Sequence, residues 1–311
     1  MAAAPPTVIA TLATIGALPD LRNLLFSLQL FQPAAPPRVY LYCDEHVATA
    51  VHSSSALGFS YKGEILTNTT ALARYSGLNR QQMEQRPGHR FPSLWFDFMA
   101  EKISLLKWAF AEEGEAAADL GVMVTDANPG ILFCDADICF FAPLPSIPAG
   151  AHVALSPHDI RATDEARYGR YNGGFAWLSH SRYADAWLAA CDAGQRFYEQ
   201  SALEDVAAMA RAAGPTALYE FPRTQNYGWW RLWQGEKSSD MLLQEWSMNR
   251  RVQPASSGIV VAGEPLGSVH THFAETRDMA TIKFNDVVKS WLRKLERGHE
   301  PARKLLHFLT H

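Results

Sequence analysis

Cysteine is scarce in this sequence and is not arranged for metal binding or disulfide formation. There are four cysteines among 311 residues, and no two of them form a C-x-x-C pair. Three of them lie in apolar runs, where cysteine behaves as a small hydrophobic residue. We therefore expect reduced, structural thiols rather than disulfides or a zinc site. The cysteines are Cys43, Cys134, Cys139 and Cys191.

Long apolar runs, an excess of positive charge and glycine-rich phosphate loops are also missing. No run approaches the roughly 18 apolar residues of a spanning helix, and the first residues lack the basic and apolar regions of a secretory signal. We therefore expect a cytoplasmic protein. The formal net charge is -4, so no global basic field attracts nucleic acid. The glycine patterns of P-loop and Rossmann nucleotide sites are absent, as are internal repeats.

What the chain does have is the composition and pattern of one large α/β domain. Hydrophobic residues make up 48% and charged residues 19%, which is ordinary for a globular protein with a substantial core. The runs Thr7–Thr14 and Arg38–Cys43 are typical of strands, and Leu18–Leu30 between them has apolar residues at helical spacing. This βαβ unit predicts a parallel sheet.

Further elements follow the same alternation of strands and helices. The polar segment Arg161–Arg170 is expected to be mobile, and Ile259–Phe273 is expected to hold a strand that ends in His270-Thr271-His272. The pattern predicts helices over Phe96–Phe110, Ser181–Ala193 and Leu203–Ala213, and strands over Ala151–Leu155 and Tyr171–Leu178.

The segment Ile131–Phe141 is the most informative part of the chain, because it places two carboxylates, Asp135 and Asp137, inside an apolar run. The run is short and bounded by proline and glycine, which predicts a buried strand. An ionised carboxylate buried without a partner is costly, so a divalent cation is expected to compensate this pair. Oxygen ligands suit Mg²⁺ or Mn²⁺. The alternative is a strand end where the carboxylates accept hydrogen bonds from loop N–H groups.

An apolar strand with Asp-x-Asp is found in two well-known families. One is the GT-A glycosyltransferases, and the other is the phosphatases that form an aspartyl-phosphate. The phosphatases also need a late acidic pair, which Glu264 and Asp278 do not supply, and their nucleophilic strand begins the fold. A third interpretation is a non-catalytic protein that binds a nucleotide sugar.

The order of motifs along the chain resembles the GT-A nucleotide-diphospho-sugar transferases, particularly the metal-dependent ones with a late metal-binding histidine. The resemblance covers roughly Thr7 to Phe273, although the family's frequent His-x-x-Gly-x-x-Lys-Pro-Trp ending is absent. It implies a GT-A, Rossmann-like α/β fold with a mixed, mainly parallel sheet flanked by helices. The motifs are a βαβ unit, a helix with Lys102, the Asp-x-Asp, Asn172-Gly173-Gly174, an acidic pair that opens a helix, and the late histidines.

The resemblance implies a site for Mn²⁺ or Mg²⁺. Asp137 would be the principal carboxylate ligand, and Asp135 would contact the metal or the ribose hydroxyls. His270 or His272 would supply a further ligand, and both could point at one site because alternate strand residues share a face. The alternative for the histidines is a strand-end pair hydrogen-bonded to loops.

The implied donor is a nucleoside-diphosphate sugar, with a UDP-sugar favoured. Several donor-binding roles have a structural alternative. The Asn-Gly-Gly could be an ordinary turn, Asp44 could cap the end of a strand, and Lys102 could be a solvated lysine on a helix. The residues implied in donor binding are Thr11, Asp44, Lys102, Asp135, Asn172, Gly173 and Gly174.

Glu204 and Asp205 fall where many retaining members of the family carry an Asp-Gln or similar pair near the anomeric carbon. A carboxylate there could be a general base or a nucleophile, so the stereochemical outcome stays open. The alternative is the first turn of a helix, where acidic residues favour the dipole. A nearby aromatic cluster would be either an acceptor platform or part of the core. Its members are Tyr227, Trp229, Trp230 and Trp233.

The last residues form a basic, amphipathic segment. We expect a single catalytic domain over residues 1–282, with a nucleotide-binding half to about residue 145 and an acceptor half from about residue 146, followed by a helical tail over 283–311. The tail would either contact the inner face of a membrane peripherally or pack on the catalytic domain with its basic side in water.

These features together predict a metal-dependent glycosyltransferase of the Leloir type. It would move a sugar from a nucleotide-diphosphate donor to a glycan or a lipid-linked acceptor, as in polysaccharide biosynthesis. The sequence identifies neither the sugar, the base nor the acceptor.

Overall fold

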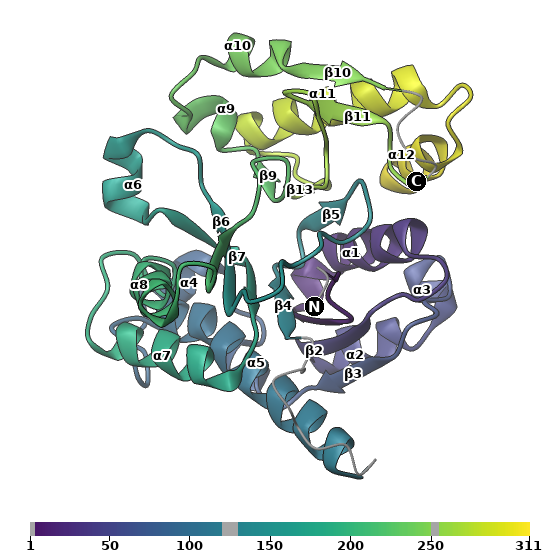
Figure 1. The fold of residues 1–311 in the computed structure, drawn as a ribbon. Coiled ribbons are helices and arrows are strands. Elements are labelled where there is room, and N and C mark those ends of the chain that lie inside the picture. Colours follow the sequence, from purple (N-terminus) through teal and green to yellow (C-terminus); the bar gives the residue numbers. More distant parts are fainter. Residues whose placement is uncertain (1–3, 120–129, 250–254) are drawn as a thin grey trace.

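The computed structural model describes residues 4–119, 130–249 and 255–311. Its central sheet contains β1 (Val8–Ala13), β2 (Arg38–Cys43), β3 (Ile65–Asn68), β4 (Ile131–Cys134), β6 (Val153–Pro157), β7 (Tyr171–Leu178) and β8 (Leu218–Glu220). The seven strands are ordered β3-β2-β1-β4-β7-β6-β8 (Figure 1). Strand β7 is antiparallel to β4 and β6, and the other pairs are parallel. The expected α/β fold with a mixed, mainly parallel sheet is therefore confirmed.

Helices flank this sheet. They are α1 (Leu18–Phe31), α2 (Glu45–Val51), α3 (Ser54–Leu57), α4 (Arg80–Glu84), α5 (Leu94–Asp119), α6 (Ala162–Tyr168), α7 (Ser181–Asp192), α8 (Leu203–Ala213), α9 (Arg231–Gln234), α10 (Ser239–Gln244), α11 (Met279–Leu295) and α12 (Glu300–Thr310), with the short 3-10 turns η1 (Ile15–Ala17) and η2 (Ala73–Tyr75). Within the described residues, no helix combines the length and the apolar character that crossing a bilayer requires.

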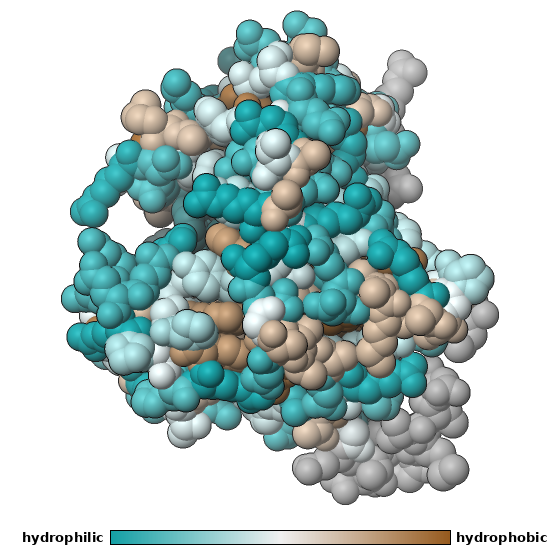
Figure 2. Space-filling model, turned by 90° about the vertical axis from the view of Figure 1, so that its left-hand side faces the viewer, coloured by the Kyte–Doolittle hydropathy of each residue, from teal (hydrophilic) through white to brown (hydrophobic). Residues whose placement is uncertain are grey.

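The core has two parts, one on each face of the sheet. In β2, Val39, Leu41 and Cys43 belong to the part that contains the buried side of α1, whereas Tyr40 and Tyr42 belong to the part that contains α5 and α7. This alternation follows from the two-residue period of a strand. The face that α6, α7 and α8 present is largely hydrophilic, with a hydrophobic patch recessed within it (Figure 2).

The predicted strand Ile131–Phe141 is wrong as a single strand. It breaks after β4, and β5 (Ile138–Phe140) leaves the central sheet. Asp135 and Asp137 lie in the turn between the two strands. The backbone N–H of Asp135 donates to the carbonyl of Gly174 (2.8 Å), and the N–H of Ile138 donates to the carbonyl of Asp135 (3.1 Å). Because of this break, both carboxylates lie just beyond the carboxyl end of β4 and outside the central sheet.

Two smaller sheets complete the upper part of the molecule in Figure 1. One has the order β5-β13-β9, and the other has the order β10-β11-β12. In the first sheet His270 is directly opposite Ile138. This pairing brings β13 and the residues that follow it to the Asp-x-Asp turn. The strands are β9 (Tyr227–Gly228), β10 (Trp246–Met248), β11 (Ile259–Val261), β12 (Glu264–Pro265) and β13 (Ser268–His270).

Two further segments can be compared with the prediction. Arg161–Arg170, for which no helix was predicted, contains α6, whose first turn carries Asp164 and Glu165 as suits a helix N-terminus. Ile259–Phe273 holds the predicted strand as β13, which ends at His270, the first of the two histidines. The segment also contains β11 and β12, which are separated by a turn at Gly263 with a left-handed φ of 88°.

The basic tail is made of α11 and α12, and α11 begins at Met279, ahead of the predicted boundary. The apolar residues of both helices point into the protein: Leu292, Leu295 and Leu305 are fully buried. Helix α12 packs on α1, where Phe308 stacks on Phe26 with 3.9 Å between ring centroids. The alternative in which the tail packs on the catalytic domain therefore accounts for these side chains, and membrane contact stays a prediction.

Removing a core side chain of α12 should destabilise the whole chain if this helix belongs to the core. We expect Leu305→Ala to lower the free energy of unfolding by about 2–5 kcal/mol, because it leaves a cavity. Arg303→Ala, on the exposed side of the same helix, should change it by less than about 0.5 kcal/mol. Urea denaturation measures both. Equal stability of the two variants would show that α12 is not part of the core.

Candidate functional site

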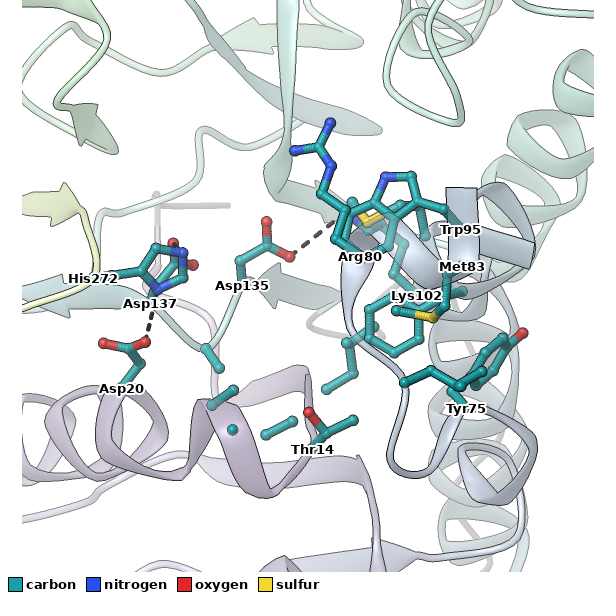
Figure 3. A pocket seen from close by; sticks show the side chains of 18 residues that line it. Thr14, Asp20, Tyr75, Arg80, Met83, Trp95, Lys102, Asp135, Asp137 and His272 are labelled. Carbon is teal, nitrogen blue, oxygen red and sulfur yellow. Dashed lines mark hydrogen bonds and ion pairs between the residues drawn. The ribbon is translucent and has the colours of Figure 1, made fainter. Parts of the chain in front are cut away.

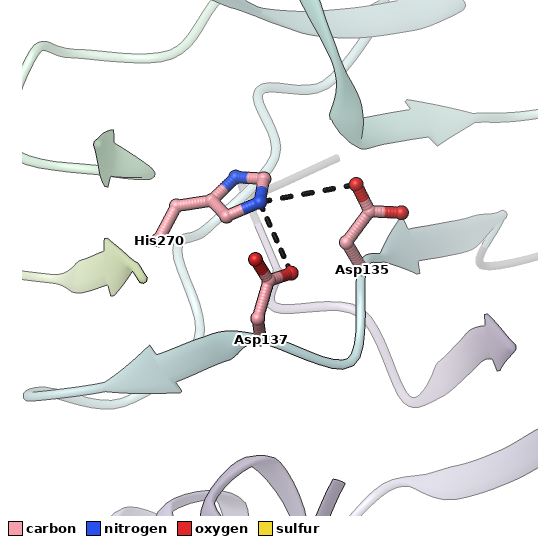
Figure 4. A group of neighbouring side chains, drawn as sticks. All are labelled: Asp135, Asp137 and His270. Carbon is pink, nitrogen blue, oxygen red and sulfur yellow. Dashed lines mark ion pairs between the residues drawn. The ribbon is translucent and has the colours of Figure 1, made fainter. Parts of the chain in front are cut away.

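Two carboxylates and one imidazole converge just beyond the carboxyl end of β4, the middle strand of the central sheet. His270 Nε2 lies 3.1 Å from Asp137 Oδ1 and 3.9 Å from Asp135 Oδ2 (Figure 4). One ligand atom from each of the three side chains lies within 4.8 Å of the others, as the groups around one cation would. Hard carboxylate oxygens with an imidazole nitrogen are a donor set suited to Mn²⁺ or Mg²⁺.

The local electrostatics keep Asp137 ionised. Burial raises the pKa of this carboxyl, but the charge and hydrogen bond of His270 and the charge of His272 outweigh burial, so the pKa falls below its ordinary value. The backbone holds the pair together as well, since the N–H of Thr271 donates to the Asp137 carbonyl (3.0 Å). Asp137 would therefore offer an ionised oxygen to a cation, and that cation would take the place of the proton through which His270 Nε2 contacts Asp137.

The second histidine lies on the other side of Asp137 and has a different partner. His272 Nε2 is 3.4 Å from Asp137 Oδ2, and its Nδ1 is 2.7 Å from Asp20 Oδ2 (Figure 3). The hydrogen bond with Asp20 and the charges of Asp137 and Asp20 outweigh burial and raise the pKa of His272 to about 9. The His272 side chain is 55% exposed, against 9% for His270. His270 alone completes the three-residue cluster among the described residues.

Asp20 is a site residue that the sequence analysis missed. It is buried in the first turn of α1 and it lines the same pocket as Asp137 and His272. Its only sequence signal is an acidic residue at a helix start, which normally reports the helix dipole and nothing more. Its partner His272 lies 252 residues away in the chain.

The carboxylates form one end of a pocket of about 370 Å³. Its floor is the end of β1 and the following turn, including Thr14 and Gly16. Its other end is aromatic: Trp95 stacks with Phe98 at 5.5 Å between centroids, and the Arg80 guanidinium lies 5.1 Å over Trp95 (Figure 3). The pocket therefore combines an anionic end with a flat apolar end, and its volume is that of a small-molecule site.

Lys102 is not the solvated helix lysine of the alternative interpretation, because its side chain is only 1% exposed. Its Nζ lies 2.7 Å from Glu199 Oε1 and 3.6 Å from Asp135 Oδ1, and it donates to the Gly173 carbonyl (3.1 Å). Burial lowers the pKa of Lys102, but the charges of Asp135 and Glu199 outweigh this and raise it. This buried ammonium pairs most closely with Glu199 and also attracts Asp135, which helps to hold that carboxylate in place.

Asn172, Gly173 and Gly174 are not a turn, because all three lie inside β7. Gly174 is required by close approach: a Cβ there would lie 2.6 Å from His270 Cε1 and closer still to the Asp135 carboxylate. The glycine therefore makes the space in which the carboxylate and the imidazole meet.

Glu204 and Asp205 are not brought to the pocket. They occupy the first turn of α8, where Glu204 accepts from the N–H of Arg170 (2.9 Å) and from Arg196 (2.7 Å), and Asp205 accepts from Gln195 (3.2 Å). Neither side chain lines the pocket. The helix-dipole alternative therefore describes them, and the catalytic assignment is not supported by their position.

Glu199 and Gln200, just ahead of α8, are two residues near the carboxylate pair that the sequence analysis missed. Gln200 Oε1 accepts from the N–H of Gly173 (3.1 Å), and Glu199 forms the buried ion pair with Lys102. No local pattern marks them, because Gly173 and Lys102 lie far from them in the chain.

Thr11 and Asp44 lie beside the site without reaching it. Thr11 is fully buried within β1, and the pocket is lined instead from Leu12 onward. Asp44 caps α2 by accepting from the N–H of Val47 (3.0 Å), and it also accepts from the N–H of Ile15 (2.6 Å). Asp44 therefore fixes the turn that follows β1, as a strand-end cap would.

The aromatic cluster divides between core and surface. Trp230 is buried, with its ring 5.0 Å from that of His270 and nearly perpendicular to it, and its Nε1 donates to the His158 carbonyl (3.2 Å). Trp233 is 38% exposed, and its ring lies 6.3 Å from that of Trp229. Trp230 therefore packs against His270, whereas Trp233 lies at the surface.

Comparisons with known proteins report similarity in structure only. No protein-family model matches the chain, and no curated protein matches it. The galactosyltransferase LgtC, solved with donor and acceptor sugar analogs, is 11% identical with a TM-score of 0.47, covering 97% of this chain and 95% of LgtC. Mouse xyloside xylosyltransferase 1 is 13% identical with a TM-score of 0.42, covering 86% of this chain and 98% of that one.

The bifunctional glycosyltransferase WbbM is 8% identical with a TM-score of 0.49, covering 95% of this chain, which spans about half of WbbM (52%). These three solved structures are glycosyltransferases. At such identities and TM-scores they carry no argument about activity, so the function proposed below is derived from the site.

Adding a methyl group at Gly174 should disturb the cation site without removing a ligand. We expect Gly174→Ala to weaken Mn²⁺ binding at least tenfold, because the new Cβ displaces the Asp135 carboxylate or the His270 ring. Gly114→Ala is the control, since nothing lies within 4 Å of a Cβ at that position and its φ is not left-handed. Titration of Mn²⁺ followed by its electron paramagnetic resonance measures both. Unchanged affinity in Gly174→Ala would contradict the close packing at the site.

Proposed function

We propose that this chain is a metal-dependent glycosyltransferase whose donor is a nucleoside-diphosphate sugar. The observation that carries the proposal is the cluster of Asp135, Asp137 and His270, whose two carboxylates line one end of a pocket of about 370 Å³. An anionic end of this kind can hold a diphosphate only through a cation, since the carboxylates would otherwise repel it. A divalent cation supplies that bridge and stabilises the departing nucleoside diphosphate.

His270 rather than His272 is the proposed metal ligand. His270 Nε2 faces both carboxylates, whereas His272 faces Asp137 alone and is held through its other nitrogen by Asp20. His272 is also the more exposed of the two, and it lines the pocket. Its proposed role is to lie beside the donor diphosphate as a cationic hydrogen-bond donor, consistent with its raised pKa of about 9.

The aromatic end of the pocket suits the nucleobase. Trp95 and Phe98 offer flat apolar faces to a planar ring, and a uracil, as in a UDP-sugar, is a base of suitable size. The opposite end would then hold the diphosphate and the sugar, near Gly173 and Gln200. This arrangement replaces the earlier assignment of donor contacts to Thr11 and Asp44.

The acceptor is proposed to be a glycan or a lipid-linked glycan. The exposed ring of Trp233 and its neighbour Trp229 adjoin Trp230, which contacts His270. Indole faces bind the apolar side of sugar rings, so this surface could guide an acceptor toward the cation site.

Removing the central carboxylate should abolish metal-dependent donor binding. We expect Asp137→Ala to lose Mn²⁺-dependent binding of UDP, and His270→Ala to weaken it more than His272→Ala does. Asp286→Ala, which removes an exposed carboxylate from α11, should bind as the unaltered chain does. Calorimetry with and without Mn²⁺ measures binding, and circular dichroism confirms folding. Undiminished Mn²⁺-dependent binding in Asp137→Ala would sink the proposal.

A further inference from the structure

Asn226 is a buried residue just ahead of β9 that contacts the proposed metal ligand from behind. Its side-chain oxygen lies 2.9 Å from His270 Nδ1, and its Nδ2 lies 3.0 Å from Asn172 Oδ1 and 3.1 Å from Ser156 Oγ. The residue is 0% exposed and does not line the pocket. It therefore touches neither the pocket nor solvent, and among its partners His270 belongs to the cluster with Asp135 and Asp137.

The orientation of the Asn226 amide follows from the backbone N–H of Gly174, which acts through the side chain of Asn172. The N–H of Gly174 donates to Asn172 Oδ1 (3.0 Å), so that atom of Asn172 is the oxygen. The Asn226 atom that meets the same oxygen must then be the donor, which is Nδ2. The other atom of the Asn226 amide, which faces His270, is consequently an oxygen and can only accept.

An accepting oxygen at Asn226 determines where the hydrogen of His270 lies. Nδ1 of His270 must carry a hydrogen in order to donate to it. In a neutral imidazole this leaves the lone pair on Nε2, the atom that faces Asp135 and Asp137. Metal-binding histidines commonly have such a partner on their second nitrogen, and loss of the partner typically lowers metal affinity about 10- to 100-fold.

We propose that Asn226 is a positioning residue that holds His270 in the tautomer and orientation required to bind the cation. The inference rests on the proposed function, because it takes the cation to bind at Asp135, Asp137 and His270. It extends that function by assigning a role to a buried amide outside the pocket. It also connects the ligand to β7, since Asn172 contacts both Asn226 and the backbone of Gly174.

The backbone at Asn226 explains how the amide is kept in place and which variant tests it. Asn226 has a left-handed φ of 52°, which asparagine and glycine adopt more readily than other residues do. Its N–H donates to Ser268 Oγ (2.8 Å) in the strand that carries His270. Asn226→Gly therefore removes the amide while leaving both the φ angle and this backbone hydrogen bond available.

The first measurement is the affinity for Mn²⁺ alone, from the electron paramagnetic resonance of the free ion. We expect Asn226→Gly to bind about 10- to 100-fold more weakly than the unaltered chain. In a His270→Ala background the same change should have no further effect, because Asn226 acts through His270. Ser156→Ala removes another partner of the same amide but leaves the contact between Asn226 and His270 in place. This variant should therefore retain its Mn²⁺ affinity within about threefold.

The second measurement is the spin-echo modulation that ¹⁵N-labelled histidine imposes on bound Mn²⁺. A directly bound imidazole nitrogen should be seen in the unaltered chain and in His272→Ala. It should be lost in His270→Ala and lost or weakened in Asn226→Gly. A general loss of stability would not produce this pattern, since it would act equally in the His270→Ala background.

The outcomes separate this inference from the proposed function. If the unaltered chain binds no Mn²⁺, both are overturned. If it binds Mn²⁺ through Asp137 but Asn226→Gly binds equally well with an unchanged nitrogen signal, only the role of Asn226 is overturned. An equal loss of affinity from Asn226→Gly with and without His270 would also overturn it, because the amide would then act on the fold as a whole.

Discussion

Compensation of two carboxylates in a partly buried turn is the constraint on which the rest of this site depends. Asp135 and Asp137 are held close together where the chain leaves the central sheet, and burying a charge without a partner is costly. Lys102 approaches Asp135 from α5, and the two histidines approach Asp137 from β13 and the residues after it. The positive partners thus come from elements far apart in the sequence, so the site exists only in the folded chain.

The fold meets this constraint through one strand pairing and one glycine. Pairing of β5 with β13 sets His270 opposite Ile138, and Gly174 in β7 leaves the space where His270 and Asp135 meet. Asn226 and Asp20 each hold one imidazole through its Nδ1 atom. The partner of His270 is a neutral amide, whereas the partner of His272 is a carboxylate that raises the pKa of that histidine.

The sequence predicts those parts of this arrangement that are written in local patterns. The βαβ unit, the carboxylate pair and the Asn-Gly-Gly strand could be recognised because periodicity and residue type mark them directly. Asp20, Glu199 and Asn226 could not, since their importance comes from partners that only the tertiary structure brings near. Glu204 and Asp205 were chosen for the catalytic role on position alone, and the ion pair of Glu204 with Arg196 shows what such a choice leaves out. The break after β4 was missed because an apolar run does not reveal a turn within it.

The central claim is that one cation binds between Asp135, Asp137 and His270 while a nucleoside diphosphate occupies the adjoining pocket. Anomalous diffraction at the manganese edge, from crystals grown with Mn²⁺ and UDP, tests this most directly. The account predicts one manganese peak at bonding distance from Asp137 and His270 Nε2, bridged to the diphosphate, with the base against Trp95 and Phe98. A peak bound through His272 without His270, or a diphosphate bound elsewhere with no manganese beside it, would contradict the account.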